Sequence, residues 1–260
     1  MNKNFNDLID KFKIISKKKW IKSYYKVHGT IGLTFEKELG KKIDTNYLPD
    51  YNGIEIKCTT RFSRFPISLF SIAFDGPTNK EIIRINEKYG NFDKDFPEKK
   101  TLIRKIRCNE LSKLKNNFYL SLEIEKDKLF LTVYDKNKIL IEKEAYIFLE
   151  TIKEHLNSKI KQLAIIKASK KKIDDIEYFR YYLITLYTLK NFETFINLLI
   201  NGDIEVTLNS RINKTGITAG RYYNKNLIFQ IKKDNLEKLF TQIYSYDCDK
   251  IKNFEEIQFL

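Results

Sequence analysis

The chain has 260 residues, 42% hydrophobic and 32% charged, and its 48 Lys and Arg exceed its 34 Asp and Glu to give a formal net charge of +14. This length can bury the core of one large domain or of two intimate lobes, and the basic surface indicates a polyanionic partner, with nucleic acid favoured over an anionic membrane. The sequence contains no apolar run of 18 residues and begins without the apolar segment of a signal peptide, so we expect no transmembrane helix and no membrane partner.

The N-terminal half is predicted to alternate helices with short strands. Residues 4–15 carry hydrophobic side chains at helical spacing, and Thr30 is predicted to cap a second helix that runs from about Gly32 to Gly40. Asn52-Gly53 is a hairpin signal, because both central positions of a tight turn need positive φ. The following segments are expected in this order: an apolar stretch 66–74, a turn 75–77, a helix 79–89, a three-strand meander (118–124, 128–134, 138–142), a helix 147–160 and a buried strand 163–166.

The C-terminal third is predicted to begin with a long helix, rich in Tyr and Leu, from about Asp175 to Leu199. Asn201-Gly202 would end this helix, and strands at 203–208 and 227–231 would follow it. Its aromatic residues cover more than one face, so most are assigned to the core: Tyr178, Phe179, Tyr181, Tyr182 and Tyr187.

The cysteine and histidine content restricts the possible site chemistry. Cys58, Cys108 and Cys248 are odd in number and widely spaced, which is typical of reduced cytoplasmic thiols and excludes a disulfide framework or a Cys-based zinc site. His28 and His155 are the only histidines, so a multi-His metal site is excluded; His155 is expected to be solvated on a helix.

The segment around the predicted hairpin carries the clearest chemical pattern. Glu55 and Lys57 are two residues apart in an apolar-rich run, so on a strand both side chains point the same way. The turn would return Asp50 toward them. Two carboxylates suit Mg²⁺, and a nearby ammonium suits a phosphate or an activated water. The alternative interpretation is an ordinary charged surface hairpin.

A second segment favours contact with DNA. The loop 209–226 contains Arg211, Lys214, Arg221 and Lys225 but no acidic residue. Arg and Lys suit guanine edges, and the glycines of the loop would let the backbone approach DNA closely. The alternative is a flexible, solvated hairpin loop.

Several blocks of the sequence, in order along almost the whole chain, resemble the MvaI/BcnI family of restriction endonucleases, which is related to the MutH mismatch-repair nickase. The blocks are 29–40 (GTIGLTFEKELG), 48–57 (LPDYNGIEIK), 69–70 (LF), 76–79 (GPTN), 84–90 (RINEKYG), 201–206 (NGDIEV), 229–231 (FQI) and 236–239 (LEKL). The resemblance implies a mixed α+β fold with a PD-(D/E)xK core, in which a mixed central sheet is flanked by helices and two lobes close around duplex DNA as a monomer. We expect a single domain, with a catalytic lobe of about 1–110 plus parts of 111–170 and a recognition lobe of about 171–260.

The resemblance also implies roles for individual residues. Asp50 and Glu55 match the metal-binding carboxylates, Lys57 matches the motif lysine, and Glu36 matches a helix glutamate that completes the site, with Glu38 as the competing assignment. Mg²⁺ on these carboxylates would polarise the scissile phosphate and acidify a bound water.

One departure concerns target recognition. Members of the family carry a His-Asp-x-Gly string before the final strand that helps read the outer G·C pairs of the target, whereas this chain has Tyr222, Tyr223, Asn224 and Lys225 there. The targets of the relatives therefore do not transfer to this chain. We expect DNA contacts from Arg211, Lys214, Arg221 and residues 222–225, with Arg61 and Arg64 as a further candidate surface.

The sequence thus predicts a Mg²⁺-dependent type II restriction endonuclease that cuts double-stranded DNA as a monomer in the bacterial cytoplasm, paired with a DNA methyltransferase. Two alternatives remain at this stage, a MutH-like strand nickase that acts with repair partners and a catalytically idle DNA-binding protein.

Overall fold

The protein is described here by a computed structural model that covers residues 3–26, 29–41, 48–78, 80–223 and 226–250. The chain divides into two compact units. Unit 1 contains Met1–Phe65, Asn157–Lys190 and Leu239–Leu260, and unit 2 contains Pro66–Leu156 and Asn191–Lys238. These bounds differ from those of the two predicted lobes, because residues 66–110 belong to unit 2 and residues 171–190 return to unit 1.

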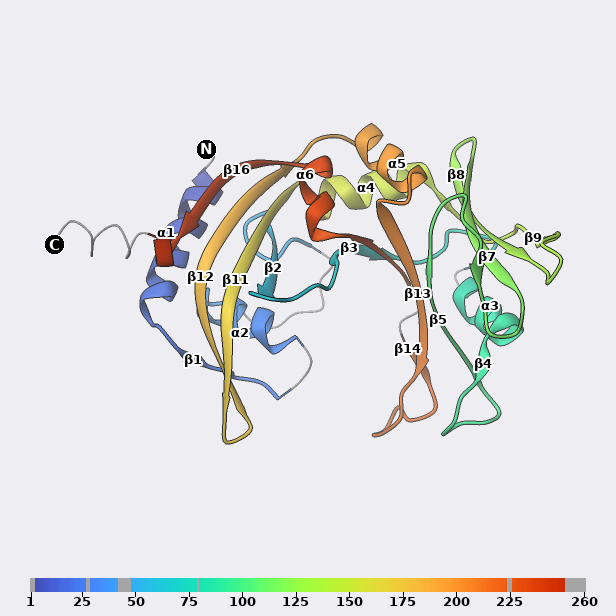
Figure 1. Ribbon diagram of the computed structural model, residues 1–260, viewed down its shortest axis with the longest axis horizontal. Coiled ribbons are helices and arrows are strands. Elements are labelled where there is room, and N and C mark those ends of the chain that lie inside the picture. Colours follow the sequence, from blue (N-terminus) through green and yellow to red (C-terminus); the bar gives the residue numbers. More distant parts are fainter. Residues whose placement is uncertain (1–2, 27–28, 42–47, 79, 224–225, 251–260) are drawn as a thin grey trace, which may run out of the picture. The chain divides into compact units, whose positions relative to one another are not determined.

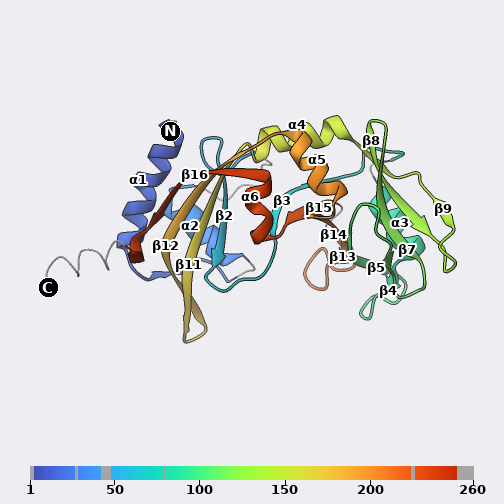
Figure 2. The same cartoon turned by 45° about the horizontal axis from the view of Figure 1, so that its top comes forward.

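Unit 1 is built on a five-stranded mixed sheet in the order β1-β12-β11-β2, with β16 also paired to β12. Strands β2 and β11 are parallel, and the other pairs are antiparallel. Figures 1 and 2 show β11 and β12 as long curved strands with helix α1 alongside them. The elements of this unit are α1 (Lys3–Lys17), β1 (Ile21–Lys22), α2 (Thr30–Glu38), β2 (Glu55–Thr60), β11 (Gln162–Ile173), β12 (Ile176–Leu189) and β16 (Phe240–Asp247).

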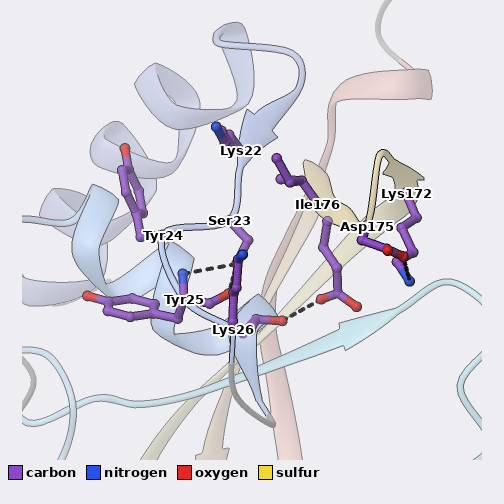
Figure 3. A pocket seen from close by; sticks show the side chains of 10 residues that line it. Lys22, Ser23, Tyr24, Tyr25, Lys26, Lys172, Asp175 and Ile176 are labelled. Atoms are coloured by element: carbon purple, nitrogen blue, oxygen red, sulfur yellow. Dashed lines mark hydrogen bonds and ion pairs between the residues drawn. The ribbon is translucent and has the colours of Figure 1, made fainter.

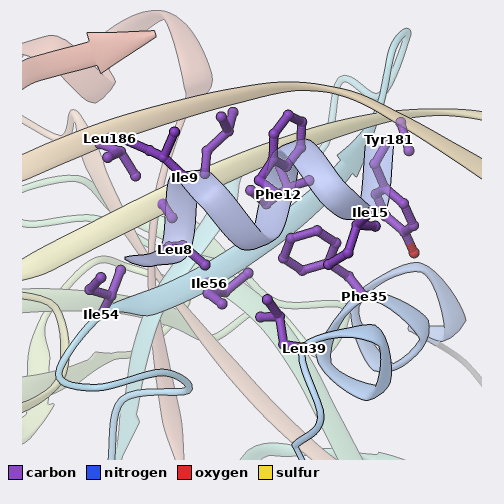
Figure 4. Close-up of a cluster of buried hydrophobic side chains, with 14 of the residues drawn as sticks. Leu8, Ile9, Phe12, Ile15, Phe35, Leu39, Ile54, Ile56, Tyr181 and Leu186 are labelled. Atoms are coloured by element: carbon purple, nitrogen blue, oxygen red, sulfur yellow. The ribbon is translucent and has the colours of Figure 1, made fainter. Parts of the chain in front are cut away.

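The core of unit 1 lies between this sheet and the two helices. Helix α1 directs its predicted apolar stripe inward, and Phe12 packs near Phe35 of α2 with ring centroids 6.3 Å apart. Phe35 in turn lies 5.0 Å from the ring of Tyr181 on β12. Figure 4 shows these rings meeting Ile54 and Ile56 of the hairpin and β2. The strand with the predicted catalytic residues is therefore anchored by a fully apolar layer.

Helix α2 is confirmed, but its predicted N-terminal cap is wrong. The cap residue is Gly29, with φ of 81°, and Thr30 is the first helical residue. The Thr30 hydroxyl donates to Glu177 on β12 at 2.6 Å, so it is not available to cap the helix. The predicted stop at Gly40 is consistent with the structure, where this glycine follows the C-cap residue with φ of 82°.

The predicted helix 175–199 is wrong. Residues Ile176–Leu189 form strand β12, and only Phe192–Ile200 form a helix, α5. Strand β12 is paired with β11 along one edge and with β1 and β16 along the other. Its backbone groups therefore form hydrogen bonds with neighbouring strands and not within a helix. Its Phe179, Tyr181, Tyr182 and Tyr187 are all buried. A central strand that is covered on both faces reads as a continuous apolar run, which periodicity alone does not distinguish from a buried helix.

Unit 2 contains two antiparallel sheets. A six-stranded sheet has the order β3-β15-β13-β5-β4, with β14 paired to β13; a five-stranded sheet has the order β10-β8-β7-β6, with β9 paired to β8. The strands are β3 (Ile67–Ile72), β4 (Asn91–Phe92), β5 (Lys100–Ile106), β6 (Ser112–Lys113), β7 (Tyr119–Glu125), β8 (Lys128–Tyr134), β9 (Leu140–Glu142), β10 (Tyr146–Phe148), β13 (Ile204–Ile212), β14 (Tyr222–Tyr223) and β15 (Leu227–Ile231). The predicted meander is confirmed as β7, β8 and β9.

The helices of unit 2 are α3 (Glu81–Tyr89), α5 and η1 (Lys233–Asn235), together with α4 (Leu149–Lys159) and α6 (Leu236–Leu239), whose last residues belong to unit 1. Helices α3 and α4 begin close to their predicted positions, whereas α5 begins at Phe192 instead of at about Asp175. Position 79, where α3 was predicted to begin, lies outside the described residues.

His155 on α4 is half-buried, and its Nδ1 lies 2.9 Å from the Thr151 carbonyl oxygen, so the expectation of a solvated residue is wrong. Within the described ranges no helix is long and apolar enough to cross a membrane.

A buried ion-pair network joins α3 to β9. Glu142 accepts hydrogen bonds from Lys88 at 2.7 Å and from the Tyr89 hydroxyl at 2.6 Å, and it pairs with Arg84 at 2.5 Å. Burial by itself would raise the pKa of Glu142, but the bonds from Arg84, Lys88 and Tyr89 outweigh burial and lower this pKa from 4.5 to about 2. The network is therefore a stabilising contact only while Glu142 is ionised.

Glu142→Gln is expected to lower the free energy of unfolding by about 2 kcal/mol at pH 7, a discounted figure because the Arg84 and Lys88 side chains are 34% and 55% exposed. Because the folded-state pKa is depressed, this stabilisation is full above pH 4.5 and disappears as the pH falls toward 2. Urea unfolding at pH 7 and pH 3 measures the difference. Glu144→Gln is the control, since Glu144 is 66% exposed and only approaches Arg84 at 3.8 Å. An equal loss for Glu142→Gln at both pH values would assign the effect to packing.

Candidate active site and DNA interface

The predicted hairpin before β2 is present. Tyr51 and Ile54 exchange backbone hydrogen bonds of 2.9 and 2.8 Å, and the two residues between them, Asn52 and Gly53, have φ of 46° and 82°. Two consecutive positive φ values are those of the turn that suits the twist of a hairpin. The turn brings Asp50 back onto β2, where its Oδ2 accepts the backbone N–H of Ile56 at 2.9 Å.

Glu55 and Lys57 share one face of β2, as their spacing predicts. The Lys57 ammonium donates to Glu55 Oε1 at 2.5 Å, and the Lys159 ammonium at the end of α4 lies 3.7 Å from the same oxygen. The Glu55 side chain is only 2% exposed, and its Oε2 is buried with no hydrogen-bond partner among the described groups. Burial raises the pKa of Glu55, and Lys57 opposes that rise.

Glu36 comes from α2 and joins this group through Lys41. The Lys41 ammonium lies 3.2 Å from Asp50 Oδ1 and 3.9 Å from Glu36 Oε2. Burial raises the pKa of Glu36, and the charge of the nearby Asp50 raises it further. The competing Glu38 points elsewhere, since it accepts from Lys18 at 2.6 Å and from the Tyr24 hydroxyl at 2.5 Å. Unit 1 therefore brings the predicted residues Glu36, Asp50, Glu55 and Lys57 into one site.

The donor set of this site fits a hard divalent ion. Asp50, Glu55 and Glu36 supply carboxylate oxygens, and the buried Glu55 Oε2 is an acceptor with no partner of its own. Among the described residues, no three His, Cys, Asp or Glu side chains already stand together as a ready set of ligands. Instead, ammonium groups lie against each of the three carboxylates.

Cys58 follows Lys57 on β2 and packs against the core of unit 1. Burial raises the pKa of its thiol well above the ordinary value, and the charges of Glu36 and Asp50 add to that rise. Cys58 is therefore a neutral side chain at neutral pH and not a nucleophile.

The predicted DNA-reading loop belongs to unit 2 and is shorter than expected. Strand β13 extends to Ile212, and β14 pairs with it, with Arg211 opposite Tyr223. The side chains of Arg211 and Arg221 are exposed, and within the described part of the chain no carboxylate pairs with Arg221. Tyr222 and Tyr223 are half-buried. The remaining predicted contacts, Asn224 and Lys225, lie outside the described residues.

Lys214 in this loop has counter-charges that the loop sequence does not contain. Its ammonium pairs with Asp93 and, at 3.1 Å, with Asp95, both from the connection between β4 and β5. The same connection holds the loop a second time, because Lys99 donates to the backbone oxygen of Gly220. The tip of the loop is thus docked on residues 93–99, and the interpretation of a loop free of counter-charge is wrong for Lys214.

The segment after β2 forms a second basic surface, in unit 1. Arg61 and Arg64 are exposed there, and Phe62 and Phe65 are 87% and 81% exposed. Arg61 and Phe62 line a pocket of ≈ 510 Å³ together with Lys170, Lys171 and Lys172 of β11. Exposed aromatic rings between basic side chains are a combination that suits a nucleic-acid backbone and its bases.

Comparisons with known proteins identify the fold and the family. The structure of restriction endonuclease MvaI in complex with a cognate DNA substrate is 23% identical, with a TM-score of 0.86 over 94% of this chain and 98% of that chain. MvaI in the absence of DNA is 20% identical, with a TM-score of 0.59 over the same shares. A profile of the MvaI/BcnI restriction endonuclease family matches residues 9–240. The chain belongs to this family. No curated protein matches it.

Membership of the MvaI/BcnI family makes the protein a type II site-specific deoxyribonuclease, and it confirms the resemblance and the mixed α+β fold expected from the sequence. Two lysines of the endonuclease site were missed at the sequence level. Lys41 directly follows Gly40, and a glycine that ends a helix turns the chain back over the last helical turn. This signal could have predicted that Lys41 lies near Glu36. Lys159 carries no such signal, because only the pairing of β2 with the strand after α4 brings it to Glu55.

A further pocket of ≈ 640 Å³ in this MvaI/BcnI family member is separate from the predicted residues. Figure 3 shows the segment of Lys22, Tyr24, Tyr25 and Lys26 beside the tip of the β11–β12 hairpin, with the two tyrosine rings directed away from that tip. The acidic residues in it already have partners: Glu177 accepts from Thr30, and Asp175 pairs with Lys172 at 2.6 Å. Neither the predicted catalytic residues nor the predicted DNA-reading loop contribute to the lining of this pocket.

Proposed function

We propose that this endonuclease hydrolyses phosphodiester bonds of duplex DNA at the site formed by Glu36, Asp50, Glu55 and Lys57, with Mg²⁺ bound by the three carboxylates. The observation that carries the proposal is the buried Glu55 Oε2, which has no partner among the described groups, on the strand that also carries Lys57 and onto which the hairpin returns Asp50. An acceptor left unsatisfied in a nearly water-free position costs free energy unless a cation binds it.

The positions of Glu36, Glu55 and Lys57 indicate a separate role for each residue in the reaction. When bound, Mg²⁺ supplies Lewis-acid polarisation of the scissile phosphate and a lower pKa for an attacking water. Glu55 accepts a 2.5 Å hydrogen bond from the Lys57 ammonium, and that ammonium orients the attacking water or stabilises the negative charge on the phosphoryl oxygens. Glu36 completes the carboxylate group from α2.

Target recognition is proposed for unit 2. Arg211, Arg221, Tyr222 and Tyr223 lie on or beside the β13–β14 hairpin, where the exposed guanidinium of Arg221 suits a guanine edge. We propose that Asn224 and Lys225 also contact DNA, and that Arg61 and Arg64 contact the DNA backbone from unit 1. Lys214 is proposed to hold the loop in place through Asp93.

We further propose that the enzyme acts as a monomer in the cytoplasm of a bacterium and that a methyltransferase protects the host target. The alternatives make different products. A MutH-like nickase would stop after one strand is cut, and an idle DNA-binding protein would leave DNA intact.

Supercoiled plasmid that contains the target tests this function. With Mg²⁺ we expect nicked circles to build up before linear DNA, because a single active site in a monomer cuts the two strands in separate events. EDTA should abolish cleavage, and Ca²⁺ should support binding without turnover, since it has similar oxygen ligands but is larger. Full cleavage in EDTA would contradict the metal site, a final nicked product would favour the nickase, and linear DNA formed with no nicked intermediate would contradict the monomer.

A further inference from the structure

The carboxylates of the active site are matched by an equal number of lysines. Glu36, Asp50 and Glu55 face Lys41, Lys57 and Lys159 at N···O distances from 2.5 to 3.9 Å. Among the ion pairs of the described residues, Lys57 and Lys159 contact Glu55. Lys41 contacts two different carboxylates, one from α2 and one from the arm before the hairpin.

The position of Lys41 is set by the end of α2. Gly40 has φ of 82°, its N–H donates to the Lys37 carbonyl at 2.9 Å, and the Lys41 N–H donates to the Glu36 carbonyl at 3.0 Å. These paired bonds form the glycine-dependent ending of a helix, which turns the chain back over the last helical turn. The backbone of Lys41 is thereby tied to the residue whose carboxylate it faces.

The partners of Lys41 are also held in place. Asp50 is oriented by the Ile56 N–H at 2.9 Å, and the side chains of Glu36, Lys41 and Asp50 are only 21%, 18% and 18% exposed. In such a shielded group, like charges repel more strongly than at the surface, so two adjacent carboxylates need a cation. Among the described groups, the cation that contacts both carboxylates is the Lys41 ammonium.

We propose that Lys41 is an internal counter-ion that holds Glu36 and Asp50 together in the metal-free enzyme, and that a divalent cation must displace its ammonium in order to bind. This inference rests on the proposed metal site. It makes Lys41 a positioning residue that stabilises the metal-free enzyme and lowers its affinity for metal. An enzyme of this kind keeps its carboxylates in place without metal and engages the metal at the cost of breaking an ion pair.

The test compares variants of Lys41 without DNA. Lys41→Met is expected to bind Ca²⁺ about tenfold more tightly by calorimetry, because a competing positive charge is removed. The same variant is expected to melt at a lower temperature than wild type in EDTA and to gain more from added Ca²⁺. Lys41→Arg keeps the charge and is expected to resemble wild type in both measurements. Lys37→Met is the matched control, since Lys37 is exposed in the last turn of α2, just before Lys41, and its ammonium lies over the Tyr24 ring at 4.7 Å.

The outcomes separate this inference from the proposed function. Asp50→Asn should weaken Ca²⁺ binding; unchanged binding would overturn the metal site itself. If Asp50→Asn loses binding while Lys41→Met binds Ca²⁺ no more tightly than wild type, the counter-ion role of Lys41 is overturned. Lys41→Gln, which keeps a polar side chain, replaces the methionine variant if that variant does not fold, and the same gain in affinity is expected.

Discussion

Lys57→Ala is expected to slow cleavage of cognate duplex on the order of a thousandfold while leaving the fold and most DNA binding intact. The Lys57 side chain is 30% exposed, and its ammonium pairs with Glu55, so its removal is expected to take away the group proposed to face the water or the phosphate and little else. Single-turnover cleavage measures the rate, and circular dichroism checks the fold. Asp50→Ala and Glu55→Ala should lose at least as much, because each removes a proposed metal ligand.

A matched lysine variant controls for the general loss of positive charge. Lys18→Ala removes a 2.6 Å ion pair with Glu38 in the same unit, but it touches none of the proposed catalytic residues, and its cleavage rate should stay near that of wild type. Cleavage at a near wild-type rate by purified Lys57→Ala protein would refute the assignment of Lys57.

Arg221→Ala should weaken cognate binding and cutting about 10- to 100-fold, because a bidentate Arg–guanine contact contributes about 1–3 kcal/mol of discrimination. Binding to a scrambled duplex should change little and should keep its steep salt dependence. Titrations of cognate and scrambled duplexes across a salt series measure both quantities. Equal losses on the two duplexes would make Arg221 a backbone contact.

Lys214→Ala serves as the comparison for Arg221. From sequence alone, a phosphate contact at Lys214 predicts a smaller salt slope for its alanine variant, whereas pairing with Asp93 and Asp95 predicts an unchanged slope. If neither Arg211→Ala nor Arg221→Ala reduces cognate binding, the reading surface lies elsewhere, and Arg61 and Arg64 are the next candidates.

Local signals in the sequence were sufficient for much of the catalytic site. The Asn52-Gly53 turn and the two-residue spacing of Glu55 and Lys57 depend on neighbouring residues alone, so the hairpin and the shared face of β2 could be predicted. Glu36 required the family resemblance, because a glutamate on a helix has no distinguishing local pattern.

The features that were missed depend on contacts between distant parts of the chain. Strand β12 was predicted as a helix because its Tyr and Leu content suits either state, and the choice is made by its pairing with β11 and β16. Lys159 reaches Glu55 only through the parallel pairing of β2 with β11, and Asp93 reaches Lys214 across 121 positions of sequence. Periodicity within a short window carries no information on such pairs.

The parallel pairing of β2 with β11 also determines when a growing polypeptide can acquire nuclease chemistry. Glu55 is registered against Leu163, and all of the first stretch of unit 2 is synthesised between them. A nascent chain that has emerged only through β10 already contains Glu36, Asp50, Glu55 and Lys57, but the catalytic strand has no sheet beside it and Glu55 lacks Lys159. Non-local pairing of this kind forms late, because a long loop must close first. We therefore expect the proposed catalytic group to assemble only after the later strands have been translated, so that incomplete chains do not cut DNA.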